Sequence, residues 1–395
     1  MTLLEGLRVV ELGVWVAGPA AGGLLADWGA DVIKVESPDG DPMRRLFALL
    51  SGHGQPQSPP FDLDNRGKRS VVLDLRTDDG RNDLRAVIES ADVFLTNLRP
   101  EAVDRLGFGP DAMLEANPRL VYAQVTGYGR TGPDAHRAGY DVGAFWARSG
   151  MAHAIVPPGE PPPFIRSGVG DHVTGMSVTA GICAALLARE RTGRGQIVDT
   201  SLLRNGIYTM GWDIGIQLRF DKLLPTVPRT EAPNPMISCY EAGDGRWFWL
   251  LGLEADRHWR PLLTAMDLES LAEDDRFVDS RARRKNAAAL VAVLDGRFAE
   301  EDRDTWTSRF DEHDVWWAPV NTVADVVADE QAIAIGAYVD VPAGAASDAH
   351  RAVMTPVEFS DADVRPRAGV PGLGEHTDEV LAEARALRTR GDAAR

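Results

Sequence analysis

The chain has 395 residues, of which 44% are hydrophobic and 26% are charged, and its formal net charge is −17 at pH 7. This balance is typical of a folded globular protein and excludes a fibrous or disordered chain. The acidic surplus disfavours nucleic acid as a partner, because negative charges repel a phosphate backbone. Cys183 and Cys239 are the two cysteines. We expect free thiols in a reducing cytoplasm, with no signal peptide and no membrane span.

The first third of the chain alternates between short β-branched runs and Ala/Leu-rich helical runs. We expect helices over residues 17–28 and 79–90, between strands over residues 7–12, 31–36, 70–75, 92–97 and 120–126. Strands that alternate with helices pair in parallel through right-handed crossovers. The sequence therefore predicts a Rossmann-like, doubly wound α/β domain.

The turn after the first strand bears on nucleotide binding. NAD-binding folds need G-x-G-x-x-G at this turn, but the sequence is Gly13-Val14-Trp15-Val16-Ala17-Gly18-Pro19. Glu36, at the end of the second expected strand, lies where an acid would hold a ribose. Without the glycine pattern, an NAD-dependent oxidoreductase is disfavoured.

Basic residues recur at or near the expected strand ends of this acidic chain. They are Lys68, Arg69, Arg76, Arg99, Arg105 and Arg137. Open α/β sheets bind ligands beyond the carboxyl ends of their strands, and guanidinium groups suit phosphates. Each residue alone is simply a solvated surface charge, but the group indicates a phosphate-bearing ligand.

A glycine-rich segment, Gly168-Val169-Gly170-Asp171, precedes a helix that we expect to run to about residue 190. The glycines permit close approach of the backbone, and free amides at a helix start stabilise a carboxylate. Taken alone, Asp171 is better explained as a helix cap than as a catalytic group. We expect the core-facing residues of this helix to be Val173, Met176, Ala180, Cys183 and Leu187.

The character of the chain changes after a proline-bearing segment at residues 225–235. A hairpin is expected at residues 238–251, followed by helical patterns to about residue 312. We therefore predict three segments: the first part of a large α/β domain (1–224), a smaller α+β domain (225–325) and a return segment that completes the large domain (326–395).

Several blocks of the chain resemble the class III CoA-transferases, the CaiB/BaiF family that includes formyl-CoA transferase and carnitine CoA-transferase. The blocks are 4–12 (LEGLRVVEL), 29–36 (GADVIKVE), 65–70 (NRGKRS), 127–129 (GYG), 131–133 (TGP), 138–141 (AGYD), 170–171 (GD), 192–196 (TGRGQ) and 373–377 (LGEHT). Together they span nearly the whole chain and are specific as a set.

The resemblance implies an enzyme that moves coenzyme A from an acyl-CoA to a free carboxylic acid. Asp171 would be the nucleophile, forming an aspartyl anhydride and then an aspartyl-CoA thioester. Coenzyme A would be a substrate, with no tightly bound cofactor and no metal. The family also implies an interlocked homodimer. The implied CoA contacts are Val16, Ala17, Arg76, Asn97, Leu98, Arg105 and Arg137. Ser37 stands where the family has a CoA-contacting arginine, and we expect Arg44 to make that contact instead.

We expect substrates other than the oxalate and formate of formyl-CoA transferase, because residues 229–260 lack the glycine-rich loop of that enzyme. Water would have to be excluded by other groups, for which Trp247, Trp249 and Trp259 are candidates, although tryptophans are also common core residues. Large side chains expected near the site favour a medium or bulky acid over a two-carbon one. These side chains are Trp15, Phe145, Trp146 and Met176.

The α-methylacyl-CoA racemases share this architecture and are the main alternative. They use a histidine and an aspartate as acid and base, and the histidine position is Tyr140 in this chain. Because tyrosine has a reference pKa of about 10, the substitution favours transfer over racemisation, and Tyr140 becomes the second catalytic candidate. His136 and His172 are expected to be a surface residue and a helix-start residue. A non-catalytic CoA-binding protein is a further alternative, which would bind CoA without chemistry at Asp171.

Overall fold

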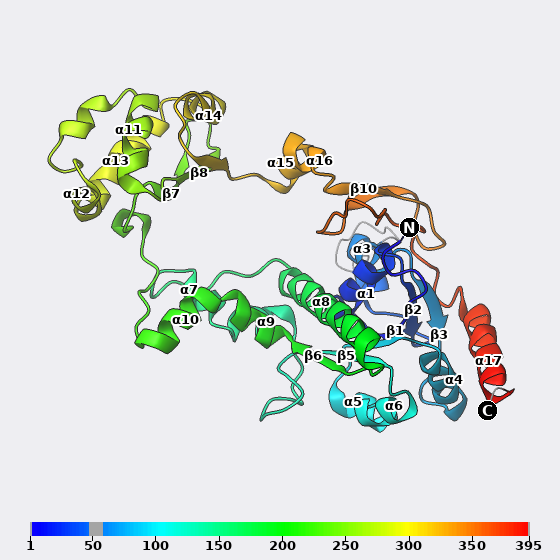
Figure 1. The fold of residues 1–395 in the computed structure, drawn as a ribbon. Helices are drawn as coiled ribbons and strands as arrows, with labels where there is room; N and C mark the ends of the chain where they lie inside the picture. The colour runs from blue at the N-terminus through cyan, green and yellow to red at the C-terminus, as the bar shows by residue number, and fades with distance from the viewer. Residues whose placement is uncertain (1, 47–57, 394–395) are drawn as a thin grey trace. The chain divides into compact units, whose positions relative to one another are not determined.

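The computed structural model describes residues 2–46 and 58–393 (Figure 1). The chain forms two compact units. Unit 1 comprises Met1–His153, Pro163–Leu223 and Ala334–Arg395, and unit 2 comprises Ala154–Pro162 and Leu224–Ile333.

The centre of unit 1 is a six-stranded parallel sheet with the order β3-β2-β1-β4-β5-β6. Its strands are β1 (Arg8–Leu12), β2 (Asp31–Glu36), β3 (Arg69–Val72), β4 (Val93–Thr96), β5 (Val121–Thr126) and β6 (Ile197–Ser201). The predicted parallel α/β sheet is confirmed. The strand order reverses between β1 and β4, and such a switch point is where open sheets of this kind bind ligands.

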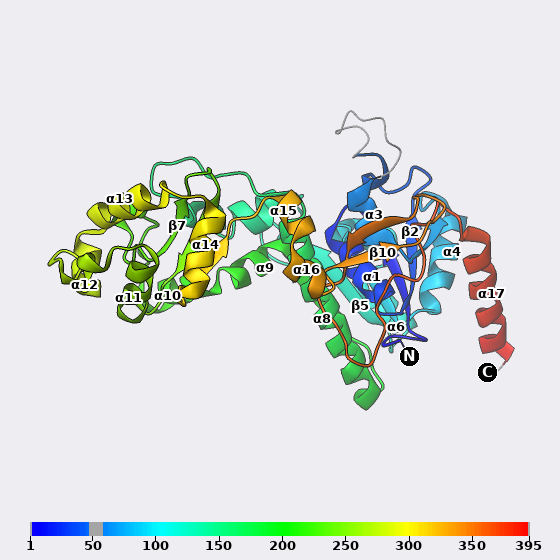
Figure 2. The same ribbon diagram turned by 90° about the horizontal axis from the view of Figure 1, so that it is seen from above.

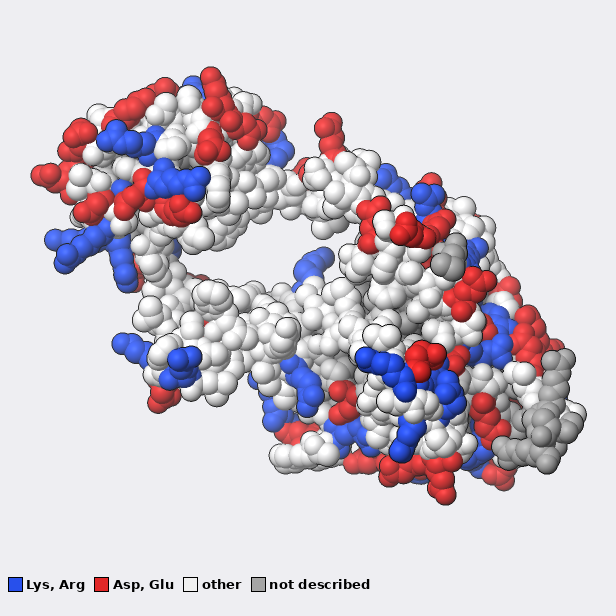
Figure 3. All heavy atoms as spheres, in the orientation of Figure 1, with Lys and Arg blue, Asp and Glu red and all other residues white. Residues whose placement is uncertain are grey.

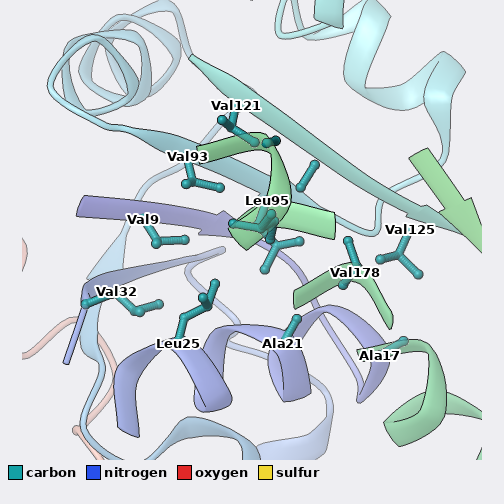
Figure 4. Close-up of a cluster of buried hydrophobic side chains, with 14 of the residues drawn as sticks. Val9, Ala17, Ala21, Leu25, Val32, Val93, Leu95, Val121, Val125 and Val178 are labelled. Carbon is teal, nitrogen blue, oxygen red and sulfur yellow. The ribbon is translucent and has the colours of Figure 1, made fainter. Parts of the chain in front are cut away.

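Helices cover both faces of the sheet, as a doubly wound fold requires. On one face, α1 (Ala17–Asp27) and α8 (Val169–Thr192) pack against the strands. Figure 4 shows Ala21 and Leu25 of α1 and Val178 of α8 directed towards Val9 and Leu95 of the sheet. On the other face lie α4 (Asp78–Glu89), α5 (Pro100–Arg105), α6 (Pro110–Ala116) and α17 (Thr377–Ala393).

The C-terminal segment returns to the sheet of unit 1. In Figures 1 and 2, α17 lies beside α4 and β3. Val380 and Ala384 of α17 are buried in the same core cluster as Leu84 and Val87 of α4. Before α17, the strands β10 (Tyr338–Val341) and β11 (His350–Val353) form an antiparallel pair.

Small residues allow α1 and α8 to approach closely. A Cβ on Gly175 of α8 would lie 3.0 Å from the Cβ of Ala20 and 3.2 Å from the carbonyl oxygen of Ala17. The face that α8 buries is therefore built from small and polar residues as well as aliphatic ones. It comprises Gly170, Thr174, Gly175, Val178, Thr179, Ile182, Ala185, Leu186 and Arg189.

The predicted core face of α8 is wrong. Met176 and Leu187, which we expected inside, are 41% and 63% exposed, Ala180 is exposed, and Val173 and Cys183 are only half-buried. The helix is apolar on most of its circumference, so hydrophobic spacing alone does not identify the buried side. By length and composition α8 would even suit a membrane span, although one face packs on α1 and the sheet.

Unit 2 combines a small antiparallel sheet with helices around an aromatic core. The sheet order is β7 (Ile237–Glu241), β8 (Trp247–Leu251), β9 (Trp317–Pro319), and β7 and β8 form the expected hairpin. Phe248, Phe298, Trp306 and Phe310 pack with ring centroids 5.0–6.2 Å apart. Trp259 belongs to this core, while Trp247 and Trp249 are partly exposed.

The remaining elements connect or flank these layers. In unit 1 they are α3 (Pro59–Asn65), the π-helix η1 (Val142–Ala147), α7 (Met151–Ala154), α9 (Leu202–Thr209) and α10 (Gly211–Phe220). In unit 2 they are η2 (Arg229–Glu231), α11 (Ala255–Ala265), η3 (Glu269–Glu273), α12 (Ser280–Lys285), α13 (Ala287–Phe298), α14 (Arg303–Glu312), α15 (Val323–Ala328) and α16 (Glu330–Ala334).

Candidate active site

The loop between β1 and α1 is attached to the end of β4 at the switch point of the sheet. The side chain of Asn97 donates to the carbonyl oxygen of Val14 at 2.6 Å and accepts from the amide of Val14 at 3.0 Å. Val16 and Leu98 lie half-buried beside this junction, and Ala17 is buried at the start of α1. Four of the residues expected to contact coenzyme A therefore lie around one point: Val16, Ala17, Asn97 and Leu98.

A buried network of charged side chains contacts the loop between β1 and α1. The Lys34 ammonium lies 3.0 Å from Glu11 and 2.9 Å from Asp41, and all three side chains are inaccessible to solvent. Asp41 in turn accepts a hydrogen bond from the amide of Trp15 at 3.2 Å. Trp15 has a φ of 67°, which is uncommon for a residue with a side chain. The network therefore holds Trp15 in a conformation that the isolated loop would not favour.

Two of the predicted phosphate-binding residues are used elsewhere. The Lys68 ammonium is buried 2.6 Å from Glu11, and Arg69 pairs with Asp31 and Glu383 at 2.6 Å and 3.0 Å. Arg69 opens β3, so it lies at the amino ends of the parallel strands, opposite the edge where ligands bind. The prediction that Lys68 and Arg69 face a phosphate is therefore wrong.

The other basic residues follow the carboxyl ends of strands. Arg76, after β3, is exposed and pairs with Asp74 at 2.8 Å. Arg99 and Arg105, at the two ends of α5, are exposed. Arg137, in the loop after β5, is exposed with one nitrogen 3.3 Å from Asp134. These guanidinium groups remain accessible to a ligand.

Arg44 is already engaged within the fold. Its Nε and Nη2 donate to the two oxygens of Glu36, both at 2.7 Å, and its Nη1 donates to the carbonyl oxygen of Pro371 at 3.1 Å. Glu36 also accepts from the hydroxyl of Ser70 at 2.7 Å. Glu36 is thus part of an internal ion pair, and a phosphate contact by Arg44 requires that pair to rearrange.

The Asp171 carboxylate lies in the first turn of α8 but does not cap it. Gly168 occupies the N-cap position, with a φ of 83°, and Asp171 is the third residue of the helix. A Cβ on Gly170 would lie 2.5 Å from the ring of Phe145, so only glycine fits there. Among the residues that the structure describes, none donates a hydrogen bond to the Asp171 carboxylate. A half-buried acid without a donor is typical of a functional group rather than a structural one.

The protonation of Asp171 is strongly perturbed. Burial raises the pKa of its carboxyl to about 7, and the negative charges of Asp141 and Asp64 act in the same direction, while His172 opposes them. An ordinary aspartate is fully ionised at that pH. Asp171 is therefore an unusually basic carboxylate at the point where α8 begins.

Asp141 fastens the start of α8 to the neighbouring π-helix. Its two oxygens accept from the amides of Val142 at 2.7 Å and Gly168 at 2.9 Å. Tyr140, directly before it, is exposed, and its ring meets that of Trp15 edge to face at 5.8 Å. Trp15 and Tyr140 therefore connect the loop after β1 with the residues around Asp171.

Two residues of this arrangement escaped the sequence prediction, and a third was misjudged. Asp141 and Asp64 were not expected near Asp171, and His172 was expected only as a helix-start residue. The ring of His172 lies 3.2 Å from Asp64, which is 108 positions away in the chain. The Gly170-Asp171-His172 sequence was the one available signal. Among the residues described, no cluster of three or more His, Cys, Asp or Glu side chains could hold a metal ion.

Comparisons with known proteins agree with this geometry. The sequence profile described as CoA-transferase family III matches residues 4–377. The cinnamoyl-CoA:phenyllactate CoA-transferase of Clostridium sporogenes is 33% identical over 385 residues, covering 96% of this chain and 93% of that protein. The (R)-2-hydroxy-4-methylpentanoate CoA-transferase of Clostridioides difficile is 30% identical, covering 96% and 94%. A CaiB/BaiF family protein from Brucella suis has a similar crystal structure, with a TM-score of 0.86, 34% identity and coverage of 97% and 99%.

Proposed function

The chain belongs to CoA-transferase family III, and from that premise we propose that it moves coenzyme A from an acyl-CoA to a carboxylic acid through covalent intermediates on Asp171. The observation that carries this proposal is the half-buried Asp171 carboxylate, which has no hydrogen-bond donor among the described residues and a pKa raised to about 7. Poor solvation leaves a carboxylate more nucleophilic than an exposed one.

The transfer proceeds in two symmetric halves. An oxygen of Asp171 attacks the thioester carbon of the donor. The C–S bond breaks, the CoA thiolate departs, and an aspartyl anhydride is formed. The thiolate then attacks the aspartyl carbonyl, releases the donor acid and forms an aspartyl-CoA thioester. The acceptor carboxylate repeats these steps in reverse order, which regenerates Asp171. No proton is consumed overall, so the site needs an ionised carboxylate more than a general acid.

Coenzyme A would lie along the carboxyl ends of the strands. The β1–α1 loop with Val16 and Ala17, and the β4 end with Asn97 and Leu98, would contact its pantetheine arm and adenosine. Arg76, Arg105 and Arg137 would bind its phosphates, which is supported by their exposure after β3, at the end of α5 and after β5. Charge-assisted bonds to phosphate are favourable even on an acidic protein when the guanidinium groups are locally concentrated.

The acids exchanged would be medium-sized or bulky. The relatives from Clostridium sporogenes and Clostridioides difficile are named for phenyllactate and 2-hydroxy-4-methylpentanoate. In this chain Trp15 and Tyr140 form an aromatic pair near the start of α8. Such a pair offers an apolar surface to a branched or aromatic acyl group. A two-carbon acid is too small to contact this surface.

A homodimer would cover the exposed apolar side of unit 1. Tyr208, Trp212 and Leu218 of α9 and α10 are each more than 80% exposed, and uncharged residues predominate over this segment in Figure 3. Monomeric proteins rarely expose a patch of this kind. Sedimentation equilibrium tests the proposal: a species of one chain mass at micromolar concentration contradicts it.

Trapping of the activated carboxylate tests the function. The protein is incubated with a panel of acyl-CoA donors and hydroxylamine, and the mass of the peptide that contains Asp171 is measured by mass spectrometry. We expect a hydroxamate on Asp171, absent in Asp171→Ala. If no donor gives an adduct while solvent deuterium enters the α-carbon of the acyl group, the protein is a racemase of the same fold instead.

A further inference from the structure

The imidazole ring of His172 is held between two hydrogen-bond acceptors. Its Nδ1 lies 2.8 Å from the carbonyl oxygen of Gly168, and its Nε2 lies 3.2 Å from Oδ1 of Asp64. A carbonyl oxygen can only accept, so Nδ1 must carry a proton. An ionised carboxylate also only accepts, so Nε2 must carry one as well. A ring that donates from both nitrogens is an imidazolium.

The acceptors belong to rigid parts of the fold. Asp64 lies in the last turn of α3, its side chain is 4% exposed, and its carbonyl oxygen would lie 2.9 Å from a Cβ on Gly23 of α1. Gly168 is the N-cap of α8, and its amide donates to Asp141 at 2.9 Å. The ring is therefore fixed by two separate helices, and its position does not depend on a flexible loop.

We infer that His172 is held as an imidazolium by Asp64 and Gly168, and that it is a positioning residue whose charge keeps the Asp171 carboxylate ionised. This inference rests on the proposed function of Asp171. The charged groups that act on Asp171 are Asp141, at the start of η1, Asp64, from α3, and His172 itself. With two further carboxylates nearby, an ionised Asp171 is disfavoured unless a cation compensates.

The electrostatic balance points in the same direction. The hydrogen bond to Asp64 raises the pKa of His172 to about 9, against the effect of burial, and the negative charge of Asp171 contributes as well. The ring thus stays charged across the pH range in which Asp171 titrates. A neutral residue at this position would leave the negative charges of Asp171, Asp64 and Asp141 without this compensating cation.

The pH profile of catalysis separates this role from a structural one. In His172→Gln we expect the acidic limb of kcat/KM to move upward by about one pH unit, the lower end of the shift that a nearby opposite charge produces. The rate on the alkaline plateau should change little. His153→Gln is the matched control, because His153 is an exposed histidine in α7, and its limb should not move. An unmoved limb in folded His172→Gln contradicts the inference.

Nitrogen NMR of the wild-type protein tests the charge directly, even where a variant does not fold. With ¹⁵N-labelled histidine, both ring nitrogens of His172 should be protonated at pH 7.5. The signal is assigned by its loss in His172→Gln or by its displacement in Asp64→Asn. A ring that is neutral at pH 7.5, or that titrates near the reference value of about 6.5, overturns the inference. The hydroxamate on Asp171 would still form in that case, so the two proposals fail separately.

Discussion

The side-chain amide of Asn97 hydrogen-bonds both backbone polar atoms of Val14, at 2.6 Å to its oxygen and 3.0 Å to its nitrogen. Asn97 follows β4 and Val14 follows β1, so these two hydrogen bonds join the loops on either side of the point where the strand order reverses. A Cβ on Gly18 would lie 3.1 Å from the Asn97 side chain, so the glycine leaves room for this amide. The loop that begins α1 is therefore shaped from the neighbouring strand.

Asn97→Ala removes both bonds to Val14 and releases the loop. We expect a loss of about 1–3 kcal/mol in the free energy of unfolding and a rise of about tenfold in KM for the acyl-CoA, with kcat less affected. Asn286→Ala is the matched control, since it removes two amide bonds in unit 2, to Arg276 and Ala282. The control should lose stability and keep its KM, and an equal change of KM in both variants would argue against a role for the loop.

The activity should depend on the ionisation of Asp171. Its pKa is raised to about 7, and the attacking form is the carboxylate, so kcat/KM should fall tenfold per pH unit below that value. The limb should appear in the free enzyme, because kcat/KM reports groups of the unbound state. Initial rates between pH 5 and pH 9 measure it. A profile that stays flat down to pH 5 would mean that Asp171 is not the titrating nucleophile.

Burial of Asp171 should also cost stability. Its folded pKa lies above its ordinary value of 3.8, so the folded state holds the proton more tightly than the unfolded chain does. The contribution of this group to stability is present below pH 4 and is lost as the pH rises to about 7. Asp171→Asn should therefore be more stable than the wild type by on the order of 2 kcal/mol at pH 8, with a smaller difference at pH 5. Urea unfolding at both pH values checks the sign, and a less stable variant at pH 8 would contradict it.

Arg105 and Arg137 should contribute to affinity for coenzyme A through its phosphates. Each alanine variant should raise KM for the acyl-CoA about five- to tenfold at low salt, with less effect at high ionic strength because exposed charges are screened. Arg194→Ala is the control, since Arg194 is exposed in the turn after α8. Dephospho-CoA thioesters identify which arginine binds the ribose phosphate, because that variant should no longer distinguish the two substrates. Unchanged KM values in both variants would place the phosphates elsewhere.

Much of unit 1 could be predicted from local sequence. Residues 31–36 were expected as a strand and form β2 with the same bounds, because a run of β-branched residues between an aspartate and a glutamate has few other solutions. The parallel pairing followed from the alternation of strands and helices. The helical segment after Thr200 is divided at Met210 into α9 and α10, a break that hydrophobic spacing does not reveal.

The candidate site was only partly predictable, because it depends on distant contacts. Asp171 could be singled out from its glycines, but its partners Asp64 and Asp141 come from other elements, and nothing local connects them. Lys68 and Arg69 were misplaced because they precede the strand expected at residues 70–75 and so lie at the amino ends of the parallel strands, whereas ligands bind beyond the carboxyl ends. In α8, apolar residues occur on most sides of the helix, and the small residues that fit against α1, such as Gly175, determine which side is buried.

The most direct test of the central claim follows oxygen atoms through the transfer. An acceptor acid labelled with ¹⁸O in its carboxylate is turned over with an unlabelled acyl-CoA, and the Asp171 peptide is then weighed. If the acid attacks an aspartyl-CoA thioester, one labelled oxygen remains on Asp171 when the new thioester forms, so the peptide gains ¹⁸O. Full turnover without label on Asp171 would mean that coenzyme A passes between the acids without a covalent step on this residue.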